Sequence, residues 1–226
     1  MVNPCFEEPV VIHFIKNDEK QVICIQVQTY CDRLLQRHCA LIPLKANIFR
    51  TFRLTQDTFR CQGKLLLCGN GGSAADADHI VGELMKGFLL PRPADAKGLP
   101  KGLQKALPAL SLAGQTALVT ACVNDLSADL VFAQQVYGYG RPGDMLWALT
   151  TSGCSSNVLL AAQTARAIGM HVVGFTGRTG GDLASYCDVL LNVPANTPAE
   201  AQEYHLPLYH ALCAMLEETF FGNGDA

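Results

Sequence analysis

The stretch Lys64-Leu65-Leu66-Leu67-Cys68-Gly69-Asn70-Gly71-Gly72-Ser73 joins a short apolar run to a glycine-rich turn, and a helical pattern over residues 74–87 follows it. Apolar runs of this length, bounded by turn residues, are consistent with buried strands. Glycines allow a tight turn that brings backbone N–H groups close to a ligand. The start of the helix adds unpaired N–H groups and the positive end of its dipole. The stretch therefore predicts an anion-binding strand–turn–helix unit, most often a phosphate site.

The two common nucleotide-binding motifs do not fit this turn. Gly69, Gly71 and Ala74 match the relaxed dinucleotide fingerprint, which also requires an acidic residue about 20 positions later. Residues 88–94 contain no acid. The Walker pattern fails as well, because no Gly-Lys-Ser/Thr sequence follows the glycines.

A second turn of similar character lies further along the chain. An apolar run at residues 145–149 leads into Thr150-Thr151-Ser152-Gly153-Cys154-Ser155-Ser156-Asn157 and then into a helical pattern. A single hydroxyl is enough to cap a helix, whereas this turn carries several. Hydroxyls together with helix N–H groups suit a phosphate monoester. We favour phosphate binding over helix capping alone, which remains the alternative.

The composition indicates one globular domain that is long enough to bury a sizeable core: 226 residues, 49% hydrophobic, with a net charge of −3. The acidic balance argues against a nucleic-acid partner. The ten cysteines form no Cys-x-x-Cys pair and look like reduced residues of a cytoplasmic protein. No apolar run reaches 18 residues, so no membrane span is expected. Glu7 and Glu8 stand where a signal peptide would carry cations.

The pattern of elements changes near residue 63. Residues 1–62 have helical periodicity and are expected to pack on the core and in an oligomer, while residues 63–226 alternate between strand and helix. This alternation predicts an α/β fold with a parallel sheet covered on both faces. Residues 91–108, rich in Pro, Gly and Lys, predict a long exposed loop or a lid over a site. The expected strands are 64–68, 109–113, 145–149, 171–176 and 188–193; the expected helices are 74–87, 116–124, 128–138, 156–168, 180–186 and 198–220.

Two of the expected helices carry polar residues at spacings that could bring them together in a functional site. His79 and Glu83 are four residues apart and share a helix face, and Gln202 and His210 lie two turns apart on the last helix. Each pair alone could be an ordinary helix-face pair. Together the two imidazoles, the carboxylate and the amide could bind a divalent metal or act as an acid/base couple.

Four motifs together resemble the SIS (sugar isomerase) domain, and within it the phosphoheptose isomerase branch. They are Gly69–His79, Thr151–Val158, Thr176–Gly181 and Gln202–His210, and the resemblance covers roughly residues 40–222. It implies a flavodoxin-like three-layer α/β/α sandwich with a five-stranded parallel sheet and N-terminal helices. It also implies a homotetramer with shared active sites. The implied activity is conversion of sedoheptulose 7-phosphate to D-glycero-D-manno-heptose 7-phosphate through a cis-enediol.

The resemblance also implies roles for individual residues. The catalytic pair would be Glu83 and His210. One zinc ion per active site would bind His79, Glu83, Gln202 and His210, where metal is present. Substrate and phosphate contacts would come from Asn70, Gly71, Gly72, Ser73, Thr150, Thr151, Ser152, Ser155 and Gln202.

The chain departs from the family pattern at three places. Cys154 stands where an Asn is usual, and Gly87 stands where an Arg is expected, with Lys86 beside it as a replacement cation. The loop at residues 91–108 is longer than in the best-known members. The substrate is therefore less firmly indicated than the reaction class.

Three alternatives remain at this stage. The chain could be a non-catalytic SIS protein that binds a replication initiator or another protein, a sugar-phosphate-sensing regulator, or an isomerase of a different phosphosugar. Glu83 and His210 favour an enzyme over the first. Residues 1–62 show no convincing basic helix-turn-helix, which disfavours the second.

Overall fold

The computed structural model describes residues 25–222. Residues 1–24, which include Cys5, Cys24 and the start of the expected N-terminal helical segment, lie outside the described residues, as do residues 223–226. The described chain contains a five-stranded parallel sheet in the order β2-β1-β3-β4-β5. All five expected strands are confirmed: β1 Leu65–Cys68, β2 Ala109–Ser111, β3 Met145–Leu149, β4 His171–Thr176 and β5 Val189–Asn192.

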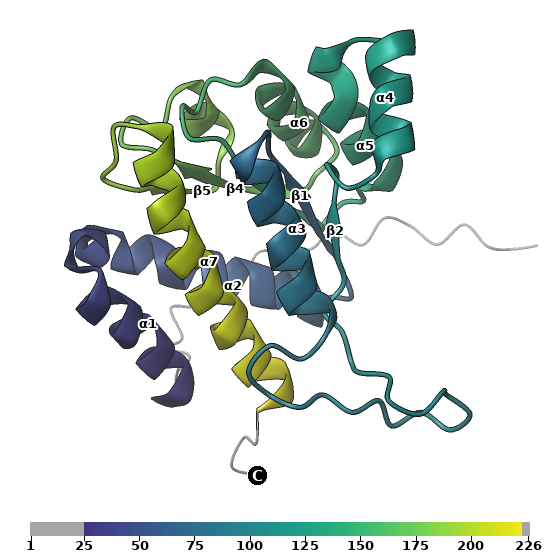
Figure 1. The fold of residues 1–226 in the computed structure, drawn as a ribbon, viewed down its shortest axis with the longest axis vertical. Helices are drawn as coiled ribbons and strands as arrows, with labels where there is room; N and C mark the ends of the chain where they lie inside the picture. The colour runs from purple at the N-terminus through teal and green to yellow at the C-terminus, as the bar shows by residue number, and fades with distance from the viewer. Residues whose placement is uncertain (1–24, 223–226) are drawn as a thin grey trace, which may run out of the picture.

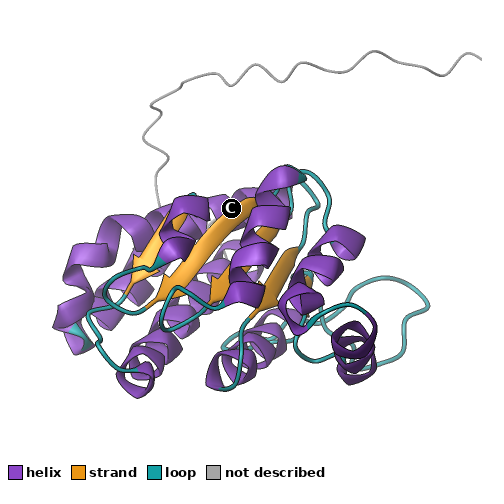
Figure 2. Ribbon diagram, turned by 90° about the horizontal axis from the view of Figure 1, so that it is seen from above, coloured by secondary structure: helices purple, strands orange, loops and turns teal. Residues whose placement is uncertain are grey.

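Helices cover both faces of the sheet, so that the molecule has three layers (Figures 1 and 2). One face carries α1 Ile25–Arg37, η1 Cys39–Leu44, α2 Lys45–Arg60, α3 Gly72–Met85 and α7 Pro198–Phe221. The other carries α4 Thr116–Asp125, η2 Ala128–Leu130, α5 Val131–Tyr139, α6 Ser156–Ala167 and η3 Asp182–Tyr186. The predicted flavodoxin-like α/β/α sandwich is therefore confirmed.

The side chains of β1 contribute to two separate cores, one on each face of the sheet. Leu65 and Leu67 point into the core beneath α1, α2, α3 and α7, whereas Leu66 and Cys68 point into the core beneath α4, α5 and α6. All four are fully buried. Successive side chains of a strand point to opposite faces, and a strand buried on both faces is apolar throughout. This is why the run in β1 shows no alternation of polar and apolar residues.

The strand order places a topological switch point between β1 and β3. The chain leaves β1 through α3 to reach β2 on one side, and leaves β3 through α6 to reach β4 on the other. In open α/β sheets, ligands bind outside the carboxyl ends of the strands at such a point. The glycine turn (residues 69–72) and the hydroxyl turn (residues 150–156) are the connections that meet there.

The segment between α3 and β2 is partly different from the expected exposed loop. Most of residues 93–106 are exposed and extend away from the body of the molecule (Figure 1). Arg92, however, is buried, and its guanidinium forms an ion pair with the buried Glu217 of α7, with an Nε–Oε1 distance of 2.7 Å. The same guanidinium donates to the carbonyls of Leu84 and Glu83 in the last turn of α3. The Pro-Arg-Pro sequence is therefore an anchor at the base of the loop.

His205, in the middle of α7, makes the stability of the fold depend on pH. Its side chain is buried, and burial lowers its pKa to about 4, although a hydrogen bond to the carbonyl of Thr176 opposes this effect. The imidazole is therefore neutral in the folded chain at pH values where it is protonated in the unfolded chain.

We expect this difference to cost about 3 kcal/mol of folding free energy as the pH falls from ~6.5 to 4, and nothing above ~6.5. Chemical denaturation of the wild type and of His205→Gln across this range measures the effect. The variant should show a shallower loss of stability. Equal slopes for the two proteins would contradict the assignment.

Candidate active site

The first turn of α3 offers backbone N–H groups without a side-chain cap. Gly71 occupies the N-cap position with a φ of 54°, a conformation that glycine adopts readily, and no side chain caps the helix there. Asn70, Gly71 and Gly72 are exposed, and Ser73 is buried beneath them. Uncapped N–H groups at a helix N-terminus form a ready site for an anion.

The hydroxyl turn before α6 is also uncapped, although it is rich in potential caps. Ser155 is the N-cap residue but makes no capping hydrogen bond. Its hydroxyl lies 2.9 Å from that of Thr150, which also lies 3.4 Å from that of Ser152. The hydroxyls therefore contact one another and do not cap α6, although the N–H of Val158 donates to the carbonyl of Ser155. This arrangement favours an anion cradle over simple capping, which was the alternative from the sequence.

The two turns are connected to each other and to the next loop. The side-chain amides of Asn70 and Asn157 exchange two hydrogen bonds of 2.9 Å across the switch point. The carbonyl of Thr151 accepts from the N–H of Gly177. Gly153, with a φ of 71°, packs so closely on the backbone of Gly180 that a Cβ there would overlap the Gly180 carbonyl. The glycine turn and the hydroxyl turn are thus joined by side-chain hydrogen bonds, and the hydroxyl turn is joined to the residues after β4.

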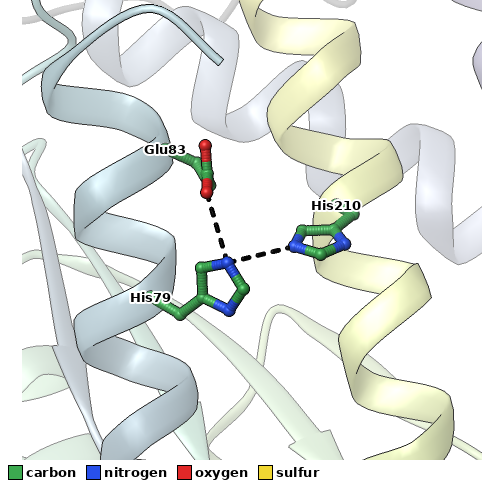
Figure 3. Close-up of side chains that lie close together, drawn as sticks. All are labelled: His79, Glu83 and His210. Atoms are coloured by element: carbon green, nitrogen blue, oxygen red, sulfur yellow. Dashed lines mark hydrogen bonds and ion pairs between the residues drawn. The ribbon is translucent and has the colours of Figure 1, made fainter. Parts of the chain in front are cut away.

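His79, Glu83 and His210 form a second group, the His/Glu/His cluster, where α3 and α7 run side by side (Figures 1 and 3). The Nε2 atom of His79 lies 3.2 Å from Oε1 of Glu83 and 3.4 Å from Nε2 of His210. The ligand atoms of all three lie within 4.8 Å of one another. The helical spacing of His79 and Glu83 places both on the face of α3 that meets α7.

The surroundings of His210 lower the pKa of its imidazole. Burial lowers the pKa of His210, the nearby His79 lowers it further, and Glu83 opposes both effects. His210 is therefore held neutral near pH 7, where it can accept a proton. His210 also borders an open groove of about 530 Å³ between α1 and α7, which His79 and Glu83 do not line.

Gln202 lies apart from this cluster. A Cβ on Gly72 would meet the Gln202 side-chain amide at 2.5 Å, so this amide rests on the first turn of α3. Gly72 and His79 are seven residues apart, or about 10 Å along the helix. The structure thus places Gln202 beside the glycine turn. Its predicted role as a fourth metal ligand would require the side chain to move.

The departure from the family pattern at Gly87 has a structural explanation. The ammonium of Lys86 lies 3.4 Å from Oε2 of Glu83, as expected for a replacement cation. A Cβ at Gly87 would lie 2.6 Å from the carbonyl of Leu90 and 2.9 Å from the side chain of Gln104. The segment after α3 therefore folds over Gly87 and leaves no room for an arginine side chain.

Three residues near the cluster were not predicted from the sequence. The hydroxyl of Tyr209 lies 3.0 Å from Nδ1 of His79 and 3.2 Å from Oδ1 of Asp76, and Arg92 donates to the carbonyl of Glu83. Asp76 lies three residues before His79, a spacing that puts both on one helix face and could have drawn attention to it. Tyr209 and Arg92 gave no such signal.

Comparison with known proteins agrees with this arrangement. Residues 29–177 match the SIS domain family, which defines the class of the protein. The chain is 45% identical over 165 residues to the phosphoheptose isomerase of a Roseiflexus species, an alignment that covers 73% of this chain and 78% of that protein.

Two solved structures are also similar. The phosphoheptose isomerase GmhA from Neisseria gonorrhoeae is 36% identical, with a TM-score of 0.70, over 84% of this chain and 95% of that one. A phosphoheptose isomerase from Francisella tularensis is 31% identical, with a TM-score of 0.71, over 85% and 96%. The chain therefore belongs to the phosphoheptose isomerase family of SIS domain proteins.

Proposed function

We propose that the chain is an aldose–ketose isomerase that converts sedoheptulose 7-phosphate to D-glycero-D-manno-heptose 7-phosphate. The observation that carries this proposal is that two helix N-termini without a side-chain cap, those of α3 and α6, meet at the switch point, with the His/Glu/His cluster further along α3. The two features are separated by about 10 Å of α3, from Gly72 to His79. An extended sugar chain spans that separation between its phosphate and its C1–C2 end, and a three-carbon sugar phosphate does not.

The residues of the cluster suit proton transfer between neighbouring carbons. In the proposed mechanism the Glu83 carboxylate removes a proton from C1 of the ketose, and the electron pair of that C–H bond forms the C1–C2 double bond. His210 moves a proton from O1 to O2 of the enediolate. Glu83 then returns its proton to C2, and O1 becomes the aldehyde oxygen. Binding of the remote phosphate positions the reacting end of the sugar.

The cluster also fits a zinc ion. Its atoms nearest one another are all electron-pair donors, namely Nε2 of His79, Nε2 of His210 and Oε1 of Glu83. Such atoms repel one another unless a proton or a metal ion lies between them, and two imidazoles with a carboxylate form a known zinc donor set. We propose that these three residues hold the metal, with Gln202 as the fourth ligand expected from the resemblance. Bound there, zinc would polarise the sugar carbonyl.

A substrate panel tests the proposal. The purified protein would be incubated with sedoheptulose 7-phosphate, with a hexose 6-phosphate and with a pentose 5-phosphate, and the aldose–ketose ratio followed over time. We expect turnover of the heptulose phosphate to exceed that of the other two. Turnover of a hexose phosphate alone would replace the substrate assignment and keep the reaction class. No turnover of any sugar phosphate would favour the non-catalytic alternative.

The hydroxyl turn gives a prediction about substrate binding. Ser152→Ala combined with Ser155→Ala should raise KM for the sugar phosphate, because each charge-assisted hydrogen bond to a phosphate is worth about 1.5–3 kcal/mol. Ser185→Ala, on η3, is a control that removes a hydroxyl bonded only to a local carbonyl. An unchanged KM in the double variant would show that these hydroxyls do not contact the phosphate.

We propose a homotetramer with shared active sites. The stripe of α1 (Val27, Cys31, Leu34 and Leu35) packs inside the subunit and so does not support an interface. Support comes instead from Leu89 and Leu206, which border the groove beside His210 and are 53% and 40% exposed.

Light scattering tests this proposal. We expect a species of four times 24.3 kDa at micromolar concentration. A monodisperse monomer would contradict both the tetramer and the sharing of active sites.

We propose that the protein is located in the cytoplasm. None of the helices in residues 25–222 combines the length and apolar character needed to cross a membrane. The cysteines within the same residues are all free, which suits the reducing conditions of the cytoplasm.

A further inference from the structure

A buried tyrosine connects the His/Glu/His cluster to a carboxylate that has no part in the mechanism above. Tyr209 precedes His210 on α7, and its side chain is fully buried against α3. Its hydroxyl lies 3.0 Å from Nδ1 of His79 and 3.2 Å from Oδ1 of Asp76. Asp76 is half-buried. Its other oxygen, Oδ2, has no hydrogen-bond partner within the described part of the chain.

The single proton of the Tyr209 hydroxyl can be given to only one of these two neighbours. The carboxylate of Asp76 is the stronger acceptor, because hydrogen bonds to a charged group are roughly twice as strong as neutral ones. Donation to His79 instead would leave both oxygens of Asp76 without a donor, and an unpaired buried charge is costly. The hydroxyl therefore donates a hydrogen bond to Asp76, and its oxygen accepts a hydrogen bond from the Nδ1–H group of His79.

This assignment fixes the other nitrogen of the ring. With the proton on Nδ1, the Nε2 atom of neutral His79 carries a lone pair. That lone pair is directed at Oε1 of Glu83, 3.2 Å away, and Nε2 of His210, 3.4 Å away. A lone pair in this position can bind a cation. The other tautomer would direct an N–H group at Oε1 of Glu83, which can accept it in the metal-free protein, and would block the cation.

We propose that Asp76 and Tyr209 are positioning residues that hold His79 as its Nδ1–H tautomer, with Nε2 available to a metal ion shared with Glu83 and His210. The proposal rests on the proposed function only for the catalytic role of the ion. The tautomer depends on the balance between Tyr209 with Asp76 at Nδ1 and Glu83 at Nε2, and it can be measured without substrate.

Nitrogen NMR of the metal-free protein tests the tautomer directly. The chain contains six histidines, and ¹⁵N-histidine labelling with a His79→Gln variant assigns the His79 signals. At a pH about two units above the ordinary histidine pKa of ~6.5, the wild type should show His79 as the Nδ1–H form. Tyr209→Phe, which keeps the ring packing and removes the hydroxyl, should shift His79 toward the Nε2–H form. Asp76→Asn should shift it in the same direction by less.

Zinc titration gives a second readout. Loss of such an orienting partner typically weakens metal binding by about 10–100-fold, and we expect Tyr209→Phe to lose affinity within this range. The double variant with Asp76→Asn should lose little more, since the two residues act in one chain. Tyr137→Phe is the matched control, because Tyr137 is 68% exposed and lies on α5, which packs on the opposite face of the sheet from α7.

The possible results separate this inference from the proposed function. His79 in the Nε2–H form in the wild type would overturn the inference, and so would a tautomer and zinc affinity unchanged by Tyr209→Phe. Either result would leave the isomerase proposal in place if the wild type turns over the heptulose phosphate. A wild type with the Nδ1–H form that isomerises no sugar phosphate would support the inference and overturn the function.

Discussion

Glu83→Gln and His210→Ala are each expected to lower kcat for the isomerisation by about 10²–10⁴, the usual contribution of a positioned proton-transfer group. The Gln side chain keeps the size of Glu83 but cannot accept a proton from carbon. The His210 imidazole, whose pKa is lowered chiefly by burial, is the neutral group facing Glu83 across the helix pair. Initial rates of aldose formation at saturating substrate measure the effect.

The double variant provides the control for this pair. Because residues that act as a unit are not additive, Glu83→Gln with His210→Ala should be little slower than either single variant. His79→Ala separates metal binding from proton transfer, since His79 transfers no proton in the proposed mechanism. Activity lost in His79→Ala and restored by added zinc would support a catalytic metal. Full turnover in folded Glu83 and His210 variants would refute the mechanism.

Glu217→Gln is expected to lower the free energy of unfolding by about 3–5 kcal/mol, the usual cost of breaking a buried ion pair. Its carboxylate accepts from Nε of Arg92 at 2.7 Å and from the backbone N–H groups of Phe88, Leu89 and Leu90. Both side chains of the pair are almost completely buried. Loss of the carboxylate charge leaves the Arg92 guanidinium uncompensated beside the C-terminal end of α3. Urea denaturation measures the change.

Two further variants show whether the ion pair is the cause. Glu203→Gln, at an exposed position of the same helix, should change stability by less than about 0.5 kcal/mol. Replacing Arg92 and Glu217 together by Met should be less destabilising than Glu217→Gln, because no buried charge is left unpaired. A double variant that is less stable than Glu217→Gln would contradict this explanation.

The layers of the fold could be predicted from the sequence because their signals are local. Apolar runs such as residues 145–149 and 171–176 predict buried parallel strands, and each was found within a residue or two of its expected bounds. The positions of the glycine turn and the hydroxyl turn could also be predicted, since each stands directly between a strand and a helix. These features depend on neighbours in the sequence.

Contacts between α3, α7 and the segment after α3 could not be predicted in this way. Arg92 and Glu217 are separated by 125 positions, and a Pro-Arg-Pro sequence in a polar segment indicates an exposed loop. Tyr209 lies in an apolar helix, where a tyrosine is ordinary core packing until its hydroxyl is seen beside His79. Likewise, helix spacing alone could not show that Gln202 rests on Gly72 rather than beside His79.

The most direct test of the central claim is deuterium exchange into sugar phosphate by the wild-type protein. Sedoheptulose 7-phosphate would be incubated with the protein in D₂O, and the C1 and C2 protons followed by NMR as the aldose forms. Because the proton that Glu83 removes from C1 can exchange with D₂O on the carboxyl group before delivery to C2, deuterium is expected at C2 of the aldose. The reverse reaction is expected to place deuterium at C1 of the ketose. The same incubation with Glu83→Gln should show neither exchange nor aldose. Absence of both aldose formation and exchange with the wild type would contradict the account.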